Sequence, residues 1–345
     1  MNFRGRGRGG LSHRPTKTTR ELCRSFTNTG ACNHGAACAF LHALQKQAEI
    51  PKAHGNACIN DVCIVADLVY TAGADDSIRG WRPTPTANGF SLSPEIVVDC
   101  PGKVTSLCFC AEGGGLLACG IAGGLIRIFN KATGAVIDLT GHTGDVFGLL
   151  IHSGVLVSAG WDATVRFWSG EGFANCAVVA LPGNIKCIQL IGGMLWVGGV
   201  HGVSAISLAT LQIATEFKFP SPVMGLKAVG PNHLLCASLD GSLRVIDTLT
   251  GQETFSSSLA SIEGDATHPN IISMEVIISA SGKMHAILGQ RAGWAKMIDL
   301  PEMTFHGRFT PLAKSADVRT IVNAGAGGLF LIGGSDGTLT LWKSL

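Results

Sequence analysis

Three cysteines and one histidine stand close together near the start of the chain, with the spacing Cys-x8-Cys-x5-Cys-x3-His. They are Cys23, Cys32, Cys38 and His42. Three thiolates and one imidazole fill the four positions of a tetrahedral Zn²⁺ ion, so no position is left for a catalytic water. A segment this short cannot bury a hydrophobic core, and the ion must supply most of its folding free energy. The spacing therefore predicts one structural Zn²⁺ ion.

A chance cluster is the alternative, because the chain has 12 cysteines. Gly30 and Gly35 argue against chance, since they fall where a tight loop between ligands needs glycine. The other cysteines lie mostly in apolar segments and are interpreted as small core residues in a reducing compartment. Residues 1–20 are rich in arginine and glycine and lack the apolar stretch of a secretory leader. We therefore expect a nuclear protein, with the cytoplasm as the alternative, and no disulfide framework.

Aromatic and basic side chains are interleaved with the four candidate ligands. Phe26 follows the first cysteine by three residues, and Phe40 lies between the last two ligands. Aromatic rings exposed on so small a fold are stacking surfaces for unpaired bases, although one of the two could instead pack against the zinc loop. Arg20 and Arg24 flank Cys23 and could bind phosphates or stack on bases. These residues are candidates for contacts with RNA.

The N-terminal part of the chain is strongly basic. Residues 1–46 hold eight Lys or Arg residues against the single acid Glu21, whereas the rest of the chain holds 18 against 23 acids. In the stretch RGRGRGG (4–10), arginines that supply charge and stacking alternate with glycines that keep a chain disordered. The arginines of this stretch are Arg4, Arg6 and Arg8. We therefore predict a disordered basic arm over residues 1–16 that binds a polyanion.

A repeated pattern runs through the rest of the chain. Four clear copies each carry an aspartate, small residues, an aliphatic residue and an apolar end: AGADDSIRGW (72–81), AGWDATVRFW (159–168), ASLDGSLRVI (237–246) and GGSDGTLTLW (333–342). With three weaker copies, the repeats end at Trp81, Phe129, Trp168, Ile206, Ile246, Ile298 and Trp342, at intervals of 38 to 52 residues. A period of about 40–45 residues with four short strands is that of WD-type β-propeller blades. The prediction is an all-β fold, a seven-bladed WD-repeat propeller over residues 46–345, preceded by a small zinc-binding domain over residues 17–45.

The aspartates of the four clear copies are predicted to lie in the turn between the second and third strands of a blade, where a short carboxylate accepts backbone N–H groups. They are Asp75, Asp162, Asp240 and Asp336; blades two, four and six lack this residue. A buried hydrogen-bond relay is expected in the third blade, from Gly141, His142, Ser158, Asp162 and Trp168. The chain ends after the third strand of blade seven, so a strand near residues 48–52 should complete that sheet. Two insertions, 82–94 and 260–270, are candidate binding loops.

The metal motif resembles the CCCH zinc-finger family with eight, five and three spacing. The resemblance rests on the ligands, on the sequence REL (20–22) before the first cysteine, and on Phe26, Gly30, Gly35 and Phe40. The chain departs from the family pattern at His34, where many relatives carry an aromatic residue that stacks on a base; an imidazole stacks more weakly. With the repeats and the segments 299–309 and 318–342, the chain over about residues 20–345 resembles the plant-type family of CCCH zinc-finger proteins with WD repeats. That resemblance implies binding of zinc and of nucleic acid, RNA in the nucleus, and no assigned reaction.

The motifs are compatible with three classes of function. The favoured one is an RNA-binding adaptor, in which the finger and arm contact single-stranded RNA, or alternatively DNA, while the propeller holds protein partners. The alternative is a protein-only adaptor, for example a ubiquitin-ligase substrate receptor, although no blade ends in Trp-Asp-x-Arg. An enzyme acting on a small molecule is disfavoured because the chain has no P-loop and no G-x-S-x-G motif. A membrane span is disfavoured as well, because glycine pairs cut the apolar stretch 187–215 into strand-sized pieces.

Overall fold

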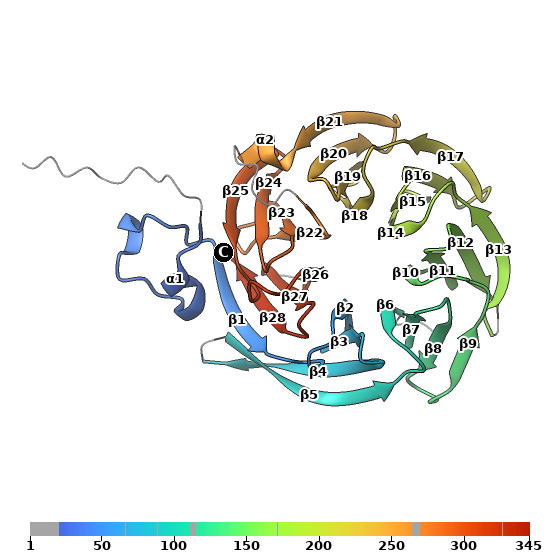
Figure 1. The fold of residues 1–345 in the computed structure, drawn as a ribbon, viewed down its shortest axis with the longest axis horizontal. Helices are drawn as coiled ribbons and strands as arrows, with labels where there is room; N and C mark the ends of the chain where they lie inside the picture. The colour runs from blue at the N-terminus through green and yellow to red at the C-terminus, as the bar shows by residue number, and fades with distance from the viewer. Residues whose placement is uncertain are drawn as a thin grey trace, which may run out of the picture.

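The computed structural model describes residues 21–345, with gaps at residues 66, 88, 111–114, 171, 264–269 and 326. The predicted basic arm lies outside the described residues, with Arg4, Arg6 and Arg8, and so does Arg20. The described strands form seven antiparallel sheets of four strands each, arranged radially in a ring (Figure 1). The predicted seven-bladed propeller is therefore confirmed. Consecutive strands pair within each blade, as short apolar segments joined by tight turns require, except that β1 joins blade seven.

The strands are numbered along the chain. Blade one contains β2 (Ile59–Val65), β3 (Leu68–Gly73), β4 (Ser77–Thr86) and β5 (Gly89–Asp99); blade two contains β6 (Val104–Cys110), β7 (Leu116–Ile121), β8 (Ile126–Asn130) and β9 (Val136–Leu139). Blade three contains β10 (Val146–His152), β11 (Val155–Gly160), β12 (Thr164–Ser169) and β13 (Ala174–Ala180); blade four contains β14 (Ile185–Ile191), β15 (Met194–Gly199), β16 (Gly202–Ser207) and β17 (Gln212–Phe217). Blade five contains β18 (Val223–Ala228), β19 (His233–Ser238), β20 (Ser242–Asp247) and β21 (Gln252–Ser258); blade six contains β22 (Ser273–Ile278), β23 (Met284–Gly289), β24 (Ala295–Leu300) and β25 (Thr304–Phe309). Blade seven contains β26 (Val318–Asn323), β27 (Leu329–Gly334), β28 (Leu339–Ser344) and β1 (Leu44–Ile50); the described helices are α1 (Arg24–Thr29), the 3₁₀ helix η1 (Gly35–Ala37) and α2 (Leu259–Glu263).

Strand β1 closes the ring by pairing with β28, the last strand of the chain. The pairing is antiparallel and runs from Leu44 opposite Ser344 to Ile50 opposite Leu339. This confirms the predicted closing strand, but the strand begins at Leu44 and ends at Ile50 rather than lying over residues 48–52. It begins early because the last candidate ligand of the finger stands only two residues before it. The finger and the propeller are thus joined without a linker.

Packing between neighbouring blades forms the hydrophobic core. The second strand of every blade is almost fully buried; in β15 five consecutive residues are buried, and Trp196 is 1% exposed. The apolar stretch 187–215 forms most of blade four, as its glycine pairs predicted. Among the described residues, no helix is long and apolar enough to cross a membrane.

The insertion over residues 82–94 is not a loop, contrary to expectation. It lengthens β4 and β5 into a long hairpin, with Arg82 opposite Ser93 and Thr86 opposite Gly89. Pro83 and Pro85 are tolerated because β3 pairs with β4 only as far as Trp81, so their missing N–H groups cost no bond on that side. Of the second insertion, residues 260–263 belong to α2 and residues 264–269 lie outside the described part of the chain.

The predicted relay of blade three is confirmed. His142 Nδ1 lies 2.9 Å from Asp162 Oδ2, and His142 Nε2 lies 2.8 Å from Ser158 Oγ. The indole N–H of Trp168 donates to the same serine oxygen at 2.8 Å. These buried hydrogen bonds therefore connect the segment ahead of β10 with β11, with the turn after β11 and with β12.

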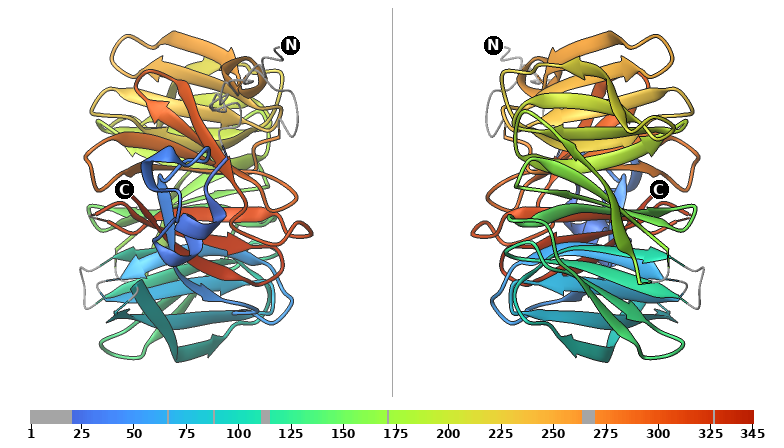
Figure 2. Two further views of the ribbon diagram at one scale, coloured as in Figure 1. Left: turned by 90° about the vertical axis from the view of Figure 1, so that its left-hand side faces the viewer. Right: turned by 90° about the vertical axis from the view of Figure 1, so that its right-hand side faces the viewer.

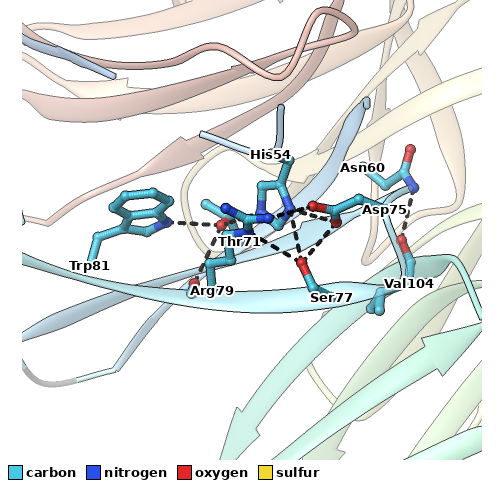
Figure 3. A network of polar contacts seen from close by, with 8 residues as sticks. All are labelled: His54, Asn60, Thr71, Asp75, Ser77, Arg79, Trp81 and Val104. Atoms are coloured by element: carbon cyan, nitrogen blue, oxygen red, sulfur yellow. Dashed lines mark hydrogen bonds and ion pairs between the residues drawn. The ribbon is translucent and has the colours of Figure 1, made fainter. Parts of the chain in front are cut away.

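A second relay, which the sequence interpretation missed, lies in blade one (Figure 3). His54 Nδ1 lies 2.8 Å from Asp75 Oδ1, His54 Nε2 lies 2.7 Å from Thr71 Oγ1, and the Trp81 indole donates to Thr71 Oγ1 at 2.9 Å. The sequence pattern of this relay differs from that of blade three in two ways. Thr71 stands where blade three has Ser158, and His54 precedes its glycine, whereas His142 follows its own. Asp162, Asp240 and Asp336 accept backbone N–H groups, as predicted. Asp75 instead accepts from side chains, including Ser77 at 2.8 Å and Arg79 at 2.9 Å.

Candidate metal centre and nucleic-acid interface

The four predicted ligands converge in the folded chain. Cys23 stands immediately before α1, Cys32 follows that helix, Cys38 directly follows η1, and His42 lies just ahead of β1. One ligand atom from each residue lies within 4.8 Å of the others. Cys23 and Cys38 are buried, whereas Cys32 and His42 are partly exposed.

Two glycines allow the chain to turn between the ligands. Gly30 ends α1 in the left-handed conformation, with φ at 72°, and its N–H donates to the carbonyl of Phe26. Gly35 begins η1 with φ at 48°. Both conformations are costly for residues with a Cβ atom, so the sequence argument for these glycines is confirmed.

The side chains fit a Zn²⁺ ion. His42 Nε2 is buried and has no hydrogen-bond partner among the described residues, as expected of a nitrogen whose lone pair awaits an ion. Phe26 stacks on the His42 ring with 4.3 Å between the ring centroids and 7° between the planes, which fixes the orientation of the imidazole. Three thiolates and one imidazole are positioned to bind one Zn²⁺ ion, which would supply folding energy to the finger.

The electrostatics of the sulfur atoms agree with a bound cation. A backbone hydrogen bond from His34 lowers the pKa of the Cys32 thiol, and this favours the thiolate. A backbone hydrogen bond from Phe40 lowers the pKa of Cys38, but burial and the neighbouring sulfur atoms of Cys32 and Cys23 outweigh it, and the pKa is raised. A thiolate at Cys38 is therefore disfavoured beside the other sulfur atoms unless a cation lies between them.

The two phenylalanines of the finger have different surroundings. Phe26 is occupied by the stacking on His42, whereas Phe40 is 44% exposed. Arg24 and His34 are exposed as well, and both line one surface hollow with Phe40, above the three ligand sulfurs. Of the two arrangements considered for the aromatic rings, the packed one applies to Phe26 and the exposed one to Phe40. The RNA contacts of these residues stay a prediction.

The finger is attached to blade six by residues that the sequence interpretation did not single out for this role. The Leu22 N–H donates to the Arg308 carbonyl at 3.3 Å, and the Arg308 guanidinium donates to Glu21 Oε1 at 3.1 Å. Leu22 is 9% exposed and packs in the core cluster that also contains Leu44 and Trp342. Figure 2 shows the finger against the outer rim of the ring. No local pattern could have revealed this contact, because it joins residues almost 300 positions apart.

Charged groups also line the central channel. Asp61 of blade one, a partly exposed residue, accepts N–H groups from Val62 and, in blade two, Leu107, and desolvation raises its pKa to about 6. Burial lowers the pKa of Lys186 to about 8, and its ammonium lies 3.6 Å from the centroid of the Phe147 ring. These contacts bridge neighbouring blades, so their role is explained by packing of the ring.

Comparison with known families agrees with both parts of the chain. Residues 18–44 match the family described as "Zinc finger C-x8-C-x5-C-x3-H type (and similar)", and residues 135–169 match the "WD domain, G-beta repeat" family. A crystal structure of the WD40 β-propeller domain of Doa1 superposes with a TM-score of 0.70 over 88% of this chain and 98% of that chain, at 16% identity, and this shows the fold alone. The chain is a CCCH-type zinc finger on a WD-repeat propeller.

Similar proteins named for a CCCH zinc finger are found in plants. The chain is 24% identical over 378 residues to zinc finger CCCH domain-containing protein 17 of Oryza sativa subsp. japonica, covering 97% of this chain and 74% of that protein. It is 26% identical over 176 residues to zinc finger CCCH domain-containing protein 48 of Arabidopsis thaliana, covering 49% of this chain and 38% of that protein. The chain is therefore similar to CCCH zinc-finger proteins of plants.

Proposed function

We propose that this protein is a zinc-dependent RNA-binding adaptor of the nucleus. In this proposal the finger binds single-stranded RNA and the propeller holds protein partners. The observation that carries the proposal is the exposed ring of Phe40, which lies with Arg24 and His34 around one hollow over the metal centre. A base can stack on an exposed ring while a guanidinium binds its phosphate, and neither contact requires a paired strand.

The stacking of Phe26 on His42 supports the choice of Phe40 as the ring that stacks on a base. Because Phe26 stacks on a ligand, it orients the metal centre, and Phe40 is the ring available to a base. The arginines predicted to bind phosphates ahead of the described residues would add attraction that does not depend on sequence; they are Arg4, Arg6, Arg8 and Arg20. The finger would thus supply a modest base preference, and the arm affinity.

The attachment of the finger supports the adaptor part of the proposal. A finger fixed to blade six through Leu22 and Arg308 would hold bound RNA at one place on the rim of the ring. Partners on the propeller then meet that RNA at a high effective concentration without having to find it by diffusion. No catalytic reaction is part of the proposal.

The test is binding of fluorescent single-stranded RNA pools to the full chain at about 50 and 200 mM salt. The full chain is needed because Leu22 and Leu44 pack in the propeller core and a finger fragment would expose them. Stacking of one base on an aromatic ring contributes about 1–3 kcal/mol, so Phe40→Ala should weaken binding about 5- to 150-fold at both salt concentrations. Arg24→Ala should lower the slope of log affinity against log salt by about 0.7.

Trp161→Ala is the matched control, because Trp161 of blade three is exposed to nearly the same extent, 46%, and lies outside the finger. It should leave RNA binding unchanged. If Phe40→Ala binds like the wild type at both salt concentrations, the base-stacking role is wrong. If, in addition, protein partners captured by the chain persist after treatment with RNase, the protein-only adaptor is the better account.

A further inference from the structure

Blade six contains a second cluster of metal-ligating side chains, formed by His285, Asp299 and His306 and called here the blade-six triad. One ligand atom from each lies within 4.8 Å of the others. His285 Nδ1 and His306 Nδ1 both lie 2.8 Å from Asp299 Oδ1. The two imidazole centroids are 5.1 Å apart, with 63° between the ring planes. The residues come from three successive strands, β23, β24 and β25.

The polar atoms of the triad are in ion-pair contact, but the buried ones lack a hydrogen bond of good geometry. His285 is only 2% exposed, and its Nδ1 atom and Asp299 Oδ1 are buried atoms with no hydrogen-bond partner among the described residues. Buried polar atoms without a partner are rare because they lose their hydration without compensation. A cation held between them would satisfy these atoms at once. The side chains of Asp299 and His306 are 31% and 26% exposed, so an ion and a water molecule can reach the cluster.

The strand register places these side chains together. His285 is directly opposite Asp299 in the pairing of β23 with β24. His306 is the extra residue of a bulge in β25, because Ile298 is opposite Phe305 and the next pair is Met297 with Gly307. A bulge redirects a side chain, and here it turns His306 toward the other two residues.

Equivalent positions in other blades carry no such set. The pairs that correspond to His285 and Asp299 include Leu116 with Asn130, Met194 with Ser207, and Leu329 with Lys343. Blade five has the closest equivalent, with His233 opposite Asp247, but Thr254 occupies its bulge and His233 is exposed. The combination of two imidazoles and a carboxylate therefore does not follow from the propeller fold itself.

We propose that the blade-six triad binds a divalent transition-metal ion of the zinc class. Two imidazoles and one carboxylate supply three ligands, and water on the exposed side completes a tetrahedral site. Bonds of about 2.0–2.1 Å place the ligand atoms of such a site about 3.3 Å apart, so the contacts to Asp299 need to open by about half an ångström. The ion would fasten β25 to β24 and β23 two residues before Arg308, which holds the finger. This site is independent of the proposed binding of RNA.

The experiment measures the zinc content of the full chain after dialysis against buffered micromolar Zn²⁺ with excess Mg²⁺. The wild type should hold two ions per chain. His306→Ala and His285→Leu should each hold one, with binding at the second site weakened at least about 10-fold. Cys38→Ala should also hold one, because it removes the finger ion and leaves the triad. When zinc already occupies the finger, added Co²⁺ should bind the triad and give visible absorption bands of the cobalt ion. The charge-transfer band of a thiolate bound to cobalt should be missing, because the triad contains no cysteine.

The matched control is His233→Ala, which removes the equivalent histidine of blade five and should leave two ions. Circular dichroism checks that every variant is folded, and His306→Ala is the safer of the two triad variants because its side chain is partly exposed. One ion in the wild type, or two in both folded triad variants, would overturn the proposal. In that case the triad is a charged pair of Asp299 with protonated His306, beside a neutral His285.

Discussion

The relay of blade three allows a quantitative test of how these blades are held together. The perturbation is Asp162→Ala, compared with Asp240→Ala at the same turn of blade five. Asp162 receives the imidazole of His142, the N–H of Thr143 and both the N–H and the hydroxyl of Thr164, all within 3.1 Å. Its side chain is 6% exposed, so water cannot replace it.

The expected costs differ because only one of the two aspartates supports a buried partner. Removing Asp162 leaves a buried imidazole nitrogen without its partner, which costs about 1–3 kcal/mol, and removes hydrogen bonds to a charged group worth about 1.5–3 kcal/mol each, which do not add fully. We expect a loss of about 3–4 kcal/mol in the free energy of unfolding. Asp240 is exposed and accepts one N–H, from Ser242, so its loss should cost about 1 kcal/mol.

The assay is urea unfolding of the full chain, followed by tryptophan fluorescence, with hydrogen exchange to locate the change. The loss of protection in Asp162→Ala should be concentrated in β10 to β12. If the two variants lose the same free energy within about 0.5 kcal/mol, the relay contributes no more than an ordinary turn aspartate, and the reasoning is refuted.

Three further predictions concern pH, metal and ring closure. Burial lowers the pKa of His54 and His142 in the folded chain, so below about pH 6.5 the unfolded chain binds more protons than the folded chain. The free energy of unfolding should therefore be unaffected by these histidines above their unfolded pKa of about 6.5 and should fall as the pH falls toward their lowered folded pKa. The loss is at most about 1.4 kcal/mol per pH unit for each histidine. Urea midpoints at pH 7.5 and 5.5 check this in Asp61→Asn, which removes the opposing titration of Asp61, and equal midpoints in that variant would contradict it. Removal of zinc by a chelator should open the finger to proteolysis while the β-sheet circular dichroism persists; simultaneous loss of both signals would show instead that the metal holds the ring. Deletion of residues 1–50 removes the closing strand and exposes the edge of β28, so light scattering should reveal self-association, whereas a chain that lacks only residues 1–20 should stay monodisperse.

The sequence was most informative where chemistry and turn geometry are local. The metal ligands follow from spacing alone, because zinc constrains residue type and distance along the chain in one short segment. The blades follow from turns such as that of Asp162, whose carboxylate acts on neighbouring backbone groups. The closing strand follows from an open sheet edge, although its start at Leu44 depends on where the finger ends.

What the sequence did not reveal depends on contacts between distant segments or on small changes of register. The relay of His54 was missed because Thr71 stands where serine was expected. The attachment of Leu22 to blade six has no local pattern, since hydrophobic residues before a metal ligand are common. The meeting of His306 with its partners depends on one bulged residue, and a shift by one residue turns a side chain to the opposite face.

The direct junction between the finger and β1 also has a mechanical meaning. Tension on a strand of RNA held at the finger would pull β1 from Leu44, the end that pairs with Ser344. Backbone hydrogen bonds between two strands break one after another, not together, when one strand is pulled from its end. β1 alone would therefore separate from β28 and open the ring. The contacts of Glu21 and Leu22 with Arg308 share that load, because they attach the other end of the finger to blade six. These contacts would therefore protect the pairing of β1 with β28, which closes the ring, from that tension.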